Sequence, residues 1–434
     1  MSVGILGGGI SGVTLQRHLH RPSVLFEKEA VLGGLSRTYW KNGFGYDIGG
    51  HILFSKHQHV TDAVNQALDE NIHQCRRLNT ILFKGRYVKY PFENDLAALE
   101  PEDRYDCLMA YLRTAMAPPP DGPPANLEEW AYRTFGRGIA DKYLIPYNRK
   151  IWKLDPADTA TEWVERIPKP PLEDVVKSSL GISTEGYTHQ LYFRYPLHGG
   201  FESVVKALRA PAADVRCGVA IERVERKGAG WRVFDGRDRH EFEHLVVTIP
   251  IHDAVRIFAG VPDEVMAAVE RLRYNAMRVV LVGVSSPSLL DKSAIYIPDE
   301  SVLPHRVCYM GFFSPNMVRP GTSSLVAEIT MPPDHALHRM SDAVMVERVV
   351  DDLHRVGIIR RAEVIETDIR QVPYGYPVSD FAFTRNKQIV HAWFRLQGVS
   401  LLGRFAEFDY INSDECMRRA MGLADVLNAG GAPS

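Results

Sequence analysis

Short apolar runs alternate with helical patterns near both ends of the chain. Residues 3–6 form an apolar run that predicts a strand, a glycine cluster follows, and residues 13–19 have the spacing of a helix. Residues 24–26 predict a second strand. Strand, helix and strand in this order predict a βαβ unit that opens a doubly wound sheet. Residues 399–402, with a helix from about 414 to 427, predict a last βα unit.

The middle of the chain predicts helices and a hairpin. Residues 101–160 have a helical pattern, and the proline-rich segment 118–124 within it cannot be helical and is expected to be a surface loop. Residues 81–90 alternate between apolar and polar side chains around Lys84-Gly85-Arg86. This alternation about a turn sequence predicts a β-hairpin.

Later apolar runs predict two further sets of strands. One set is expected to return the chain to the first sheet and comprises 219–224, 231–234 and 245–249. The other predicts antiparallel strands of a second sheet and comprises 278–284, 307–313 and 325–331.

Composition excludes several classes of protein. A chain of 434 residues should divide into two or three domains, and 45% hydrophobic with 24% charged residues is typical of a globular protein. The net charge of -2 gives no basic field for nucleic acid and no attraction to an anionic membrane, so an anionic ligand needs local cations. The five cysteines are scattered and no long apolar run occurs, so we expect no metal, no membrane span and a cytoplasmic location.

A glycine motif follows the first predicted strand and opens the first predicted helix. Gly7-Gly8-Gly9-Ile10-Ser11-Gly12 fits the dinucleotide fingerprint, in which glycines let a pyrophosphate approach the backbone at a helix N-terminus. Glu27 lies twenty residues after Gly7, at the end of the second strand, where a carboxylate accepts hydrogen bonds from the adenosine ribose. A glycine turn that binds nothing is the alternative, and the position of Glu27 argues against it.

A second glycine pair indicates FAD rather than NAD. Lys28 leads to Gly33-Gly34-Leu35-Ser36-Arg37, which offers glycines and a cation to the pyrophosphate, although Arg37 could instead be a solvated surface charge. This segment resembles the flavin amine oxidase superfamily. Gly403-Arg404-Phe405 resembles the closing motif of that superfamily, where a helix N-terminus approaches the flavin pyrimidine. FAD is therefore the predicted cofactor.

The fold class follows from these elements. We expect an α/β protein with a Rossmann-type FAD-binding domain, a helical domain and an antiparallel β-sheet substrate domain. The predicted boundaries are 1–60, 200–255 and 395–434 for the FAD-binding domain, 95–170 for the helical nucleotide-binding domain, and 75–94, 171–199 and 256–394 for the sheet domain.

Nearly the whole chain resembles the UDP-galactopyranose mutases, most of all those of the eukaryotic type. The resemblance is carried by the order and spacing of Gly49-Gly50-His51-Ile52-Leu53-Phe54-Ser55, Tyr90-Pro91-Phe92-Glu93-Asn94, 146–152, 193–196, Gly375-Tyr376-Pro377 and 403–405 with Tyr410. It implies an isomerase that interconverts the pyranose and furanose forms of a nucleotide-linked hexose, as between galactopyranose and galactofuranose. In that family reduced FAD attacks the anomeric carbon through N5, with no net redox change.

The resemblance also implies a clamp for the diphosphate. Arg166 and Arg306 match its two guanidinium groups, which stay charged and donate in a planar fork, although each could be an ordinary surface arginine. Tyr376 and Tyr410 match the hydroxyl donors of the clamp. A third tyrosine of the family is Phe313 in this chain, so one hydroxyl of the expected substrate site is lost.

The nucleotide base is expected at aromatic and amide groups, mainly of the helical domain. The matching residues are Tyr90, Phe92, Tyr143, Tyr147, Asn148 and Trp152, of which Phe92 and Trp152 could equally be core packing. Phe54 is a further expected substrate contact. Gln190 matches a position that contacts the sugar or nucleotide, where asparagine is more usual. Glu93 stands where the family commonly has glutamine. A carboxylate only accepts, so Glu93 favours a base edge with N–H groups, as in guanine or cytosine.

The resemblance further implies that His51 lies in a loop against the flavin ring near N5, whereas a satisfied core histidine is the alternative. The expected cofactor contacts are Gly7, Gly9, Ile10, Ser11, Gly12, Glu27, Lys28, Gly34, Leu35, Ser36, Gly49, Gly50, His51, Val219, Gly403, Arg404, Asn412 and Ser413.

Other functions stay open at this point. The same cofactor domain serves oxidases and desaturases of amines, porphyrins or polyenes, and a flavoprotein could bind a nucleotide sugar without turnover. Many amine oxidases have a lysine near N5 on the strand that matches Met277-Arg278-Val279, where this chain has Arg278. The expected partners are a nucleoside-diphosphate sugar and a reductant such as NAD(P)H or a flavin reductase. Because relatives self-associate, a homo-oligomer is also expected, whereas nucleic acid and membrane are not.

Overall fold

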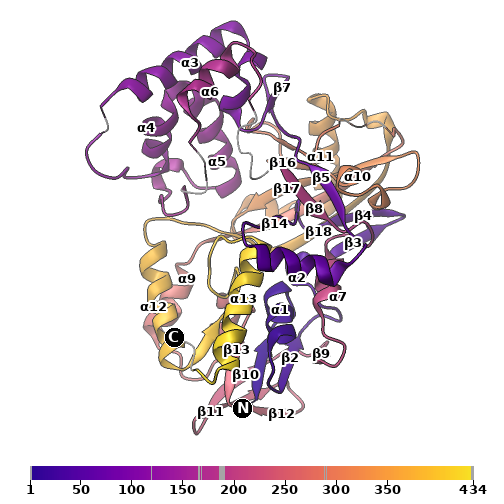
Figure 1. The fold of residues 1–434 in the computed structure, drawn as a ribbon, viewed down its shortest axis with the longest axis vertical. Helices are drawn as coiled ribbons and strands as arrows, with labels where there is room; N and C mark the ends of the chain where they lie inside the picture. Colours follow the sequence, from indigo (N-terminus) through magenta and orange to yellow (C-terminus); the bar gives the residue numbers. More distant parts are fainter. Residues whose placement is uncertain are drawn as a thin grey trace.

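The computed structural model describes residues 2–118, 120–164, 167, 169–184, 191–287, 289 and 291–431. Within them, the two largest sheets are a parallel sheet and a long sheet that is antiparallel except for one pair of strands, and a cluster of helices lies at one end of the molecule (Figure 1). This arrangement confirms the predicted fold class.

The parallel sheet lies at the lower end of the molecule in Figure 1. Its strand order is β19-β13-β1-β2-β9, with β1 (Val3–Leu6), β2 (Ser23–Glu27), β9 (Asp214–Cys217), β13 (His244–Val247) and β19 (Val399–Leu401). Leu6 pairs with Phe26 on one side and with Val247 on the other, so the carboxyl ends of these strands lie together. Such an edge is where doubly wound sheets bind their ligands.

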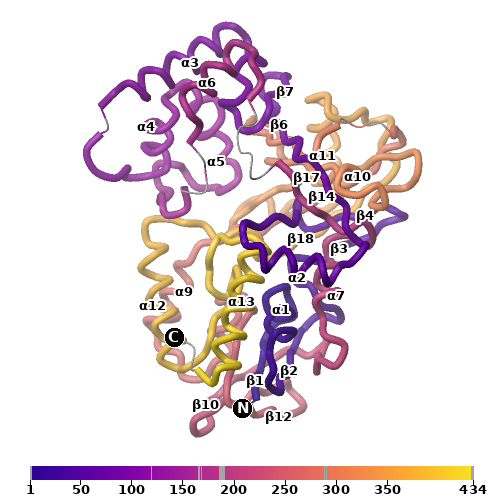
Figure 2. The backbone as a smooth tube through the Cα atoms, in the orientation of Figure 1, coloured from indigo at the N-terminus to yellow at the C-terminus, as the bar shows by residue number. Residues whose placement is uncertain are grey.

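The two ends of the chain meet on this sheet. Helix α1 (Ile10–His18) follows β1, and helix α13 (Ser413–Asn428) follows β19. The two helices pack side by side, and both termini lie at the same end of the molecule (Figure 2). The predicted βαβ unit and the predicted last βα unit are therefore confirmed.

Two of the strands expected to rejoin this sheet do not do so. β10 (Arg223–Lys227) and β11 (Gly230–Phe234) form a separate antiparallel sheet with β12 (Arg239–Phe242), so the prediction for 219–224 and 231–234 is wrong. β11 buries every second residue, whereas β1 is buried throughout. Alternating burial is typical of a half-exposed antiparallel strand and continuous burial of a parallel one. The expected strand at 245–249 does join the parallel sheet as β13, and β9, which the sequence pattern missed, joins it as well.

The antiparallel sheet faces the parallel sheet. Its order is β18-β14-β17-β16-β15-β6-β7, with β6 (Asn79–Phe83), β7 (Arg86–Lys89), β14 (Tyr274–Val284), β15 (Ala294–Tyr296), β16 (Arg306–Tyr309), β17 (Ser323–Met331) and β18 (Val364–Pro377). β6 and β7 form the predicted hairpin. The run expected as one strand over 307–313 is a strand only to Tyr309, because helix α10 (Met310–Phe313) begins there.

The helical cluster comprises α3 (Pro101–Met116), α4 (Leu127–Ile139), α5 (Ile145–Trp152) and α6 (Leu172–Ser179). The Asn126 side chain caps α4 by accepting from the Glu129 backbone N–H at 2.8 Å, as a helix N-cap should. α6 packs against α3, whereas the sequence pattern predicts 171–199 in the sheet domain. The domain boundaries otherwise stay a prediction.

The cluster is joined to the sheet at α5. The buried Lys150 ammonium donates to the carbonyl oxygens of Ile297, Asp299 and Pro304 at 2.7–2.9 Å. The Asn275 amide donates to the carbonyls of Ile151 and Trp152, which are free at a helix C-terminus. These bonds fix the cluster over the end of β14.

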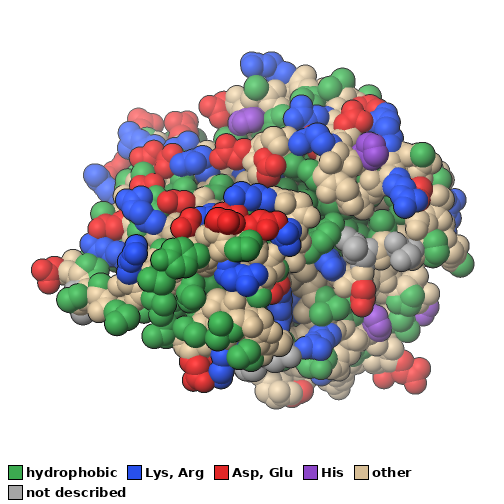
Figure 3. Space-filling view, turned by 90° about the horizontal axis from the view of Figure 1, so that it is seen from above, with side chains coloured by type: hydrophobic (Ala, Val, Ile, Leu, Met, Phe, Trp, Pro, Cys, Tyr) green, Lys and Arg blue, Asp and Glu red, His purple; other side chains and the backbone are tan. Residues whose placement is uncertain are grey.

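The remaining elements connect or cover these layers. They are α2 (Gln58–Leu68), α7 (Glu202–Leu208), α8 (Ile251–Ile257), α9 (Asp263–Glu270), α11 (Asp342–Arg355), α12 (Phe383–Leu396), and the strand pairs β3 (Thr38–Lys41) with β4 (Phe44–Asp47) and β5 (His73–Arg76) with β8 (Tyr192–Tyr195). On the face seen in Figure 3, basic and acidic side chains are interspersed among apolar ones. Among the described residues, no helix has both the length and the apolar character needed to cross a membrane.

Candidate active site

A cavity of about 1660 Å³ runs from the carboxyl edge of the parallel sheet to the helical cluster. At one end it is lined by the glycine turns after β1 and β2, in the middle by residues 48–52, and at the far end by aromatic residues of α5 and its surroundings. Pockets for one small ligand measure about 300–1,000 Å³. The cavity therefore has room for a cofactor and a substrate together.

The first glycine turn is shaped by close backbone packing. A methyl group added at Gly12 would lie 2.1 Å from the Gly7 carbonyl oxygen, whereas one at Gly9 would meet nothing within 4 Å. Gly12 thus lets α1 approach β1, and Gly9, at the N-cap of α1, leaves open space toward the cavity. Glu27 accepts from the Gly8 N–H at 2.7 Å and from the Glu29 N–H at 2.9 Å. These bonds fix its carboxylate at the cavity wall.

The second glycine pair lies directly beside the first. The Gly33 N–H donates to the Gly8 carbonyl at 2.9 Å, and the 3₁₀ helix η1 (Gly34–Ser36) follows. Arg37 lines the cavity with 25% of its side chain exposed, so it is not simply a solvated surface charge.

Unpartnered polar atoms around this cavity fit an elongated polar cofactor. His51 Nδ1, Arg37 Nε and Arg404 Nε are buried without a hydrogen-bond partner among the described residues, and all three side chains line the cavity. Buried polar atoms in folded proteins are normally paired. These three residues would hold a bound dinucleotide, and FAD fits this set of polar groups.

The loop Gly49-Gly50-His51 forms the middle of the cavity. The His51 ring stacks on Phe201 with centroids 4.8 Å apart, and its backbone N–H donates to the Gly49 carbonyl at 2.9 Å. Burial, together with the positive charges of Arg404 and Arg306, lowers the pKa of His51 to about 4. His51 is therefore neutral near pH 7.

Arg306 enters the cavity from β16 and is held by Glu328 of β17. The two residues are direct cross-strand partners, and the guanidinium donates through Nε and Nη2 to the two carboxylate oxygens at 2.8 and 2.7 Å. Glu328 is fully buried and also accepts from the Gly50 N–H at 3.2 Å. Burial alone would lower the pKa of Arg306, but the Glu328 carboxylate outweighs it and holds that pKa well above its ordinary value. Arg306 is thus a permanent cation beside the Gly50 loop.

Arg404 lies beside the rings of Tyr376 and Tyr410 and contacts both. Its guanidinium carbon is 5.0 and 4.8 Å from their ring centroids, and the two rings are 5.9 Å apart. Trp152 meets both tyrosines edge-on. Burial raises the pKa of Tyr376 above its ordinary value, so its hydroxyl stays protonated and can donate.

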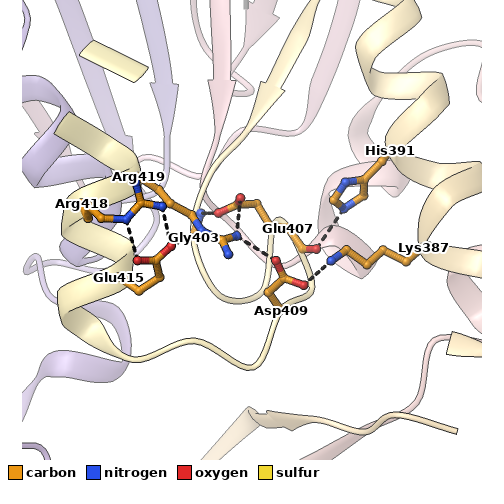
Figure 4. Close-up of polar contacts among 8 residues, drawn as sticks. All are labelled: Lys387, His391, Gly403, Glu407, Asp409, Glu415, Arg418 and Arg419. Atoms are coloured by element: carbon orange, nitrogen blue, oxygen red, sulfur yellow. Dashed lines mark hydrogen bonds and ion pairs between the residues drawn. The ribbon is translucent and has the colours of Figure 1, made fainter. Parts of the chain in front are cut away.

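A network of ion pairs fixes the loop that carries Gly403 and Arg404 (Figure 4). The Arg419 guanidinium donates to Glu407, Asp409 and Glu415 at 2.7–2.9 Å. Glu407 in turn accepts from the Gly403 N–H at 2.6 Å, and Lys387 donates to Asp409. A methyl group at Gly403 would lie 2.4 Å from the Ser11 hydroxyl, so this network holds the loop tightly against the start of α1.

The far end of the cavity is an aromatic chamber. Tyr90 stacks on Tyr296 at 4.9 Å, and Tyr143 stacks on Tyr147 at 5.5 Å. Both pairs line the cavity, together with Glu93 of the 3₁₀ helix η2 (Phe92–Ala98).

The structure brings most of the predicted site residues to this one cavity. Every expected cofactor contact lines it except Gly12, and Phe54, Tyr90, Glu93, Tyr143, Tyr147, Asn148, Trp152, Arg306, Tyr376 and Tyr410 line it as well. Arg166 and Gln190 lie outside the described residues. Their expected roles stay predictions.

Two expected substrate contacts, Phe92 and Phe313, do not line the cavity, and their roles stay predictions. Phe92 is fully buried and stacks on Tyr143 at 5.4 Å, a position that fits core packing. Phe313 is 2% exposed and packs against Phe193 and Tyr195. A phenyl ring at this buried position needs no polar partner.

The Asn148 amide is largely engaged within its own helix. It donates to the Leu144 carbonyl at 2.8 Å and accepts from the Trp152 indole N–H at 2.9 Å. The cavity-facing residue of β14 is Met277, whereas Arg278 points to the opposite face and donates to Gln371 and to the Met340 carbonyl. Successive side chains of a strand alternate between faces. Met277, and not Arg278, is therefore the residue to compare with the lysine of amine oxidases.

The sequence pattern missed several residues of the wall. Tyr296, Arg77 and Trp163 line the cavity, and Glu328 lies behind it, where it holds Arg306 and Gly50. The sequence could have indicated Glu328, because it is a lone carboxylate within the apolar run of β17. Such a charge is buried only when it is paired. No sequence feature could have identified Tyr296 and Arg77, since nothing local distinguishes them from ordinary strand residues.

Comparisons with known proteins agree with this geometry. The family described as flavin containing amine oxidoreductase matches residues 10–395. A crystal structure of reduced UDP-galactopyranose mutase is 24% identical, with a TM-score of 0.91 over 100% of this chain and 94% of that one. A candidate protoporphyrinogen oxidase from Exiguobacterium sp. 255-15 is 18% identical, with a TM-score of 0.77 over 99% of each chain. Cyclohexylamine oxidase from Brevibacterium oxydans IH-35A is 15% identical, with a TM-score of 0.68 over 99% of each chain.

These structures share a fold with this chain but act on different substrates, so they do not settle its reaction. The family match covers most of the sequence, and its cofactor fits the glycine turns and the unpartnered atoms of the cavity. The chain is therefore a member of the flavin containing amine oxidoreductase family, with FAD as its cofactor.

Proposed function

We propose that this chain is a mutase that interconverts the pyranose and furanose forms of a nucleoside-diphosphate hexose. The observation that carries the proposal is the position of Arg306, a half-buried cation fixed by the buried Glu328 where the Gly50 loop meets the aromatic chamber. A leaving diphosphate needs a cation at that junction, whereas an oxidase of apolar amines needs an apolar channel. The whole-chain likeness to a reduced UDP-galactopyranose mutase supports the same choice.

The Arg306 side chain suits a diphosphate that leaves and returns. Glu328 occupies Nε and Nη2, and no described residue hydrogen-bonds Nη1. Nη1 is therefore available to a phosphate oxygen while the guanidinium keeps a fixed orientation. Tyr376 and Tyr410 line the same stretch of the cavity and can add neutral hydroxyl donors. Arg166, which the sequence analysis pairs with Arg306, is part of the same proposal.

The remaining wall positions the sugar and base without supplying a nucleophile. Bound, reduced FAD supplies nucleophilic attack at the anomeric carbon, with no net redox change. His51 is neutral and stacked on Phe201, so it adds no charge beside the reacting groups. Met277 is the residue of β14 that lines the cavity, on the strand where many amine oxidases have a lysine. The aromatic chamber offers ring faces on which a nucleotide base can stack. A reductant such as NAD(P)H must reduce the enzyme first.

The test is turnover by the dithionite-reduced enzyme with a panel of nucleotide-linked pyranoses and furanoses, followed by chromatography. The expected result is interconversion of at least one pair, and none in the oxidised enzyme. Arg306→Ala should weaken binding of a nucleoside diphosphate roughly tenfold to a hundredfold, the value of hydrogen bonds to a charged group. Arg256→Ala, at an arginine with 69% of its side chain exposed, is the matched control and should change nothing.

The proposal fails if no pair interconverts while the enzyme consumes oxygen with an amine substrate. In that case the chain is an oxidase of the same family. An unchanged nucleotide affinity in Arg306→Ala, with the FAD spectrum intact, would remove Arg306 from the diphosphate clamp.

A further inference from the structure

We infer that Asp47 is a positioning residue of the cofactor site, because its carboxylate fixes the Phe201 ring on which His51 stacks. The inference needs bound FAD, but it does not need the mutase reaction. Asp47 is the last residue of β4 and lies four residues before His51. Its side chain is fully buried and does not line the cavity. A buried carboxylate is costly unless hydrogen-bond donors satisfy it, so its partners show what it holds in place.

Three donors from three different elements satisfy the Asp47 carboxylate. The Thr38 hydroxyl of β3 donates to Oδ1 at 2.6 Å, and the Tyr195 hydroxyl of β8 donates to Oδ2 at 2.6 Å. The Phe201 N–H, at the N-cap of α7, also donates to Oδ1, at 3.3 Å. Among the described residues Asp47 forms no ion pair, so these hydrogen bonds compensate for its burial. Asp47 therefore ties β3, β8 and the start of α7 to the strand that leads into the Gly49-Gly50-His51 loop.

The start of α7 is held closely against β3. Gly200 has a φ of 68°, and a methyl group added there would lie 2.4 Å from the Thr38 hydroxyl. The Thr38 hydroxyl accepts from the Glu202 N–H at 3.1 Å, and the Glu202 carboxylate accepts from the Thr38 N–H at 3.2 Å. The same hydroxyl donates to Asp47, so one side chain joins the start of the helix to the carboxylate. Phe201, between Gly200 and Glu202, consequently has little freedom to move.

Phe201 carries this fixed position to the cavity wall. Its ring is fully buried, and the His51 ring stacks on it with an interplanar angle of 26°. No described residue hydrogen-bonds the His51 ring, and its Nδ1 is buried without a partner among them. The orientation of the His51 ring therefore depends on packing, and the Phe201 ring supplies the stacked surface. Because His51 lines the middle of the cavity, loss of the Asp47 hydrogen bonds should move a side chain that bound FAD would contact.

The Asp47 carboxylate is mainly charged in mildly alkaline solution. Burial raises its pKa to about 7, and Glu202 adds to the rise, whereas the hydrogen bonds from Thr38, Tyr195 and Phe201 oppose it. At pH 8 an asparagine at this position therefore removes the charge with almost no change in volume.

The first experiment compares the parent with Asp47→Asn, both loaded with FAD, at pH 8. The readouts are the visible absorbance spectrum and the midpoint potential of FAD, measured against a dye of known potential. The amide accepts at only one of its two positions, so Phe201 and His51 should shift and change the surroundings of the flavin. The equilibrium constant for two-electron reduction should change about tenfold, which corresponds to about 30 mV. Asp62→Asn, at an exposed carboxylate of α2, is the matched control and should leave both readouts unchanged.

A purely structural role for Asp47 would give a different result. An Asp47→Asn protein that retains FAD and has the spectrum and the midpoint potential of the parent would overturn the inference, even if its melting temperature is lower. Tyr195→Phe removes one of the three donors but keeps the ring, and it is the variant to measure if Asp47→Asn does not fold. It should also shift the midpoint potential, and an unchanged value would overturn the inference.

The second experiment tests whether Asp47 acts through Phe201. Phe201→Leu removes the stacked ring and should itself shift the midpoint potential. Residues that act as one unit have non-additive effects, so the double variant should have the same potential as Phe201→Leu alone. Additive shifts would mean that Asp47 affects the flavin by another route, and they would overturn the inference.

This inference and the proposed function fail separately, because neither the spectrum nor the potential requires turnover. A parent that interconverts a nucleotide-linked sugar, with an Asp47→Asn variant of unchanged spectrum and potential, would reject the role of Asp47 and keep the mutase. A shifted potential in Asp47→Asn, with a parent that interconverts no nucleotide-linked sugar, would reject the mutase and keep the role of Asp47.

Discussion

Arg306 and Glu328 face each other across the antiparallel pair β16–β17 and form a two-point ion pair beside the Gly50 loop. The register of the two strands, which is fixed by the apolar residues on either side, makes this contact. The carboxylate orients the guanidinium and at the same time holds the loop through the Gly50 N–H. One buried residue therefore links the cofactor end of the cavity to the substrate end.

Glu328→Gln is expected to lower the free energy of unfolding by about 3 kcal/mol, because it leaves the half-buried Arg306 cation without its counter-charge. Urea unfolding followed by tryptophan fluorescence measures this. Glu347→Gln, which breaks an exposed ion pair with Arg361, should cost less than about 1 kcal/mol. Equal effects of the two substitutions would show that the Arg306–Glu328 pair is no more important than a surface pair.

Acidification should destabilise the protein in part through His51. Its folded pKa of about 4 lies below the ordinary value of 6.5, so the unfolded chain binds more protons between these pH values. The stabilising contribution of neutral His51 is present above pH 6.5 and is lost as the pH falls toward 4. His51→Phe keeps the ring that stacks on Phe201 but cannot titrate.

The measurement for His51 is the melting temperature at half-unit steps of pH from 7 to 4. The His51→Phe profile should fall less steeply than that of the parent over this range. His20→Gln, at an exposed histidine, is the control. Parallel profiles for His51→Phe and the parent would rule out a buried, neutral His51.

The cofactor site could be predicted from the sequence because its determinants are local. The turn at Gly7 to Gly12 and the strand end at Glu27 are set by short-range backbone requirements, which appear as residue types at fixed spacing. The aromatic chamber was also indicated, through the resemblance. The sequence could not tell which aromatic residues line the cavity and which pack behind them. Tyr143 and Phe92 are both large aromatic residues, and only packing decides which one reaches the cavity.

The contacts made across strands could not be predicted. Glu328 meets Arg306 only because of strand register, and a shift of one residue would turn either side chain to the other face of the sheet. The same alternation separates Met277 from Arg278. The separate sheet of β10 to β12 was missed because a short apolar run does not tell which sheet a strand joins.

Gly12→Ala should abolish FAD retention. The added methyl group would lie 2.1 Å from a backbone oxygen of Gly7, so α1 would have to move away from β1 and open the pyrophosphate site. The ratio of flavin to protein absorbance in the purified enzyme measures the loss. Gly422→Ala, in α13 with open space around it, should keep FAD and gain roughly 0.5–1 kcal/mol of stability from its higher helix propensity. Full FAD content in Gly12→Ala would contradict the packing described for this turn.

Lys150→Met tests how the helical cluster is fixed over the substrate end of the cavity. The substitution keeps the length of the side chain but removes the ammonium that donates to three carbonyls, and those buried acceptors would lose their partner. The expected loss is about 2–4 kcal/mol in the free energy of unfolding, from the penalty of unpaired buried groups. Lys206→Met, at a lysine with 69% of its side chain exposed, serves as the control and should cost less than about 0.5 kcal/mol. Because α5 carries Tyr147 and Trp152, the Lys150 variant should also bind nucleotides more weakly while it keeps its FAD. A variant that unfolds like the parent and binds nucleotides like the parent would mean that α5 is positioned by apolar packing alone.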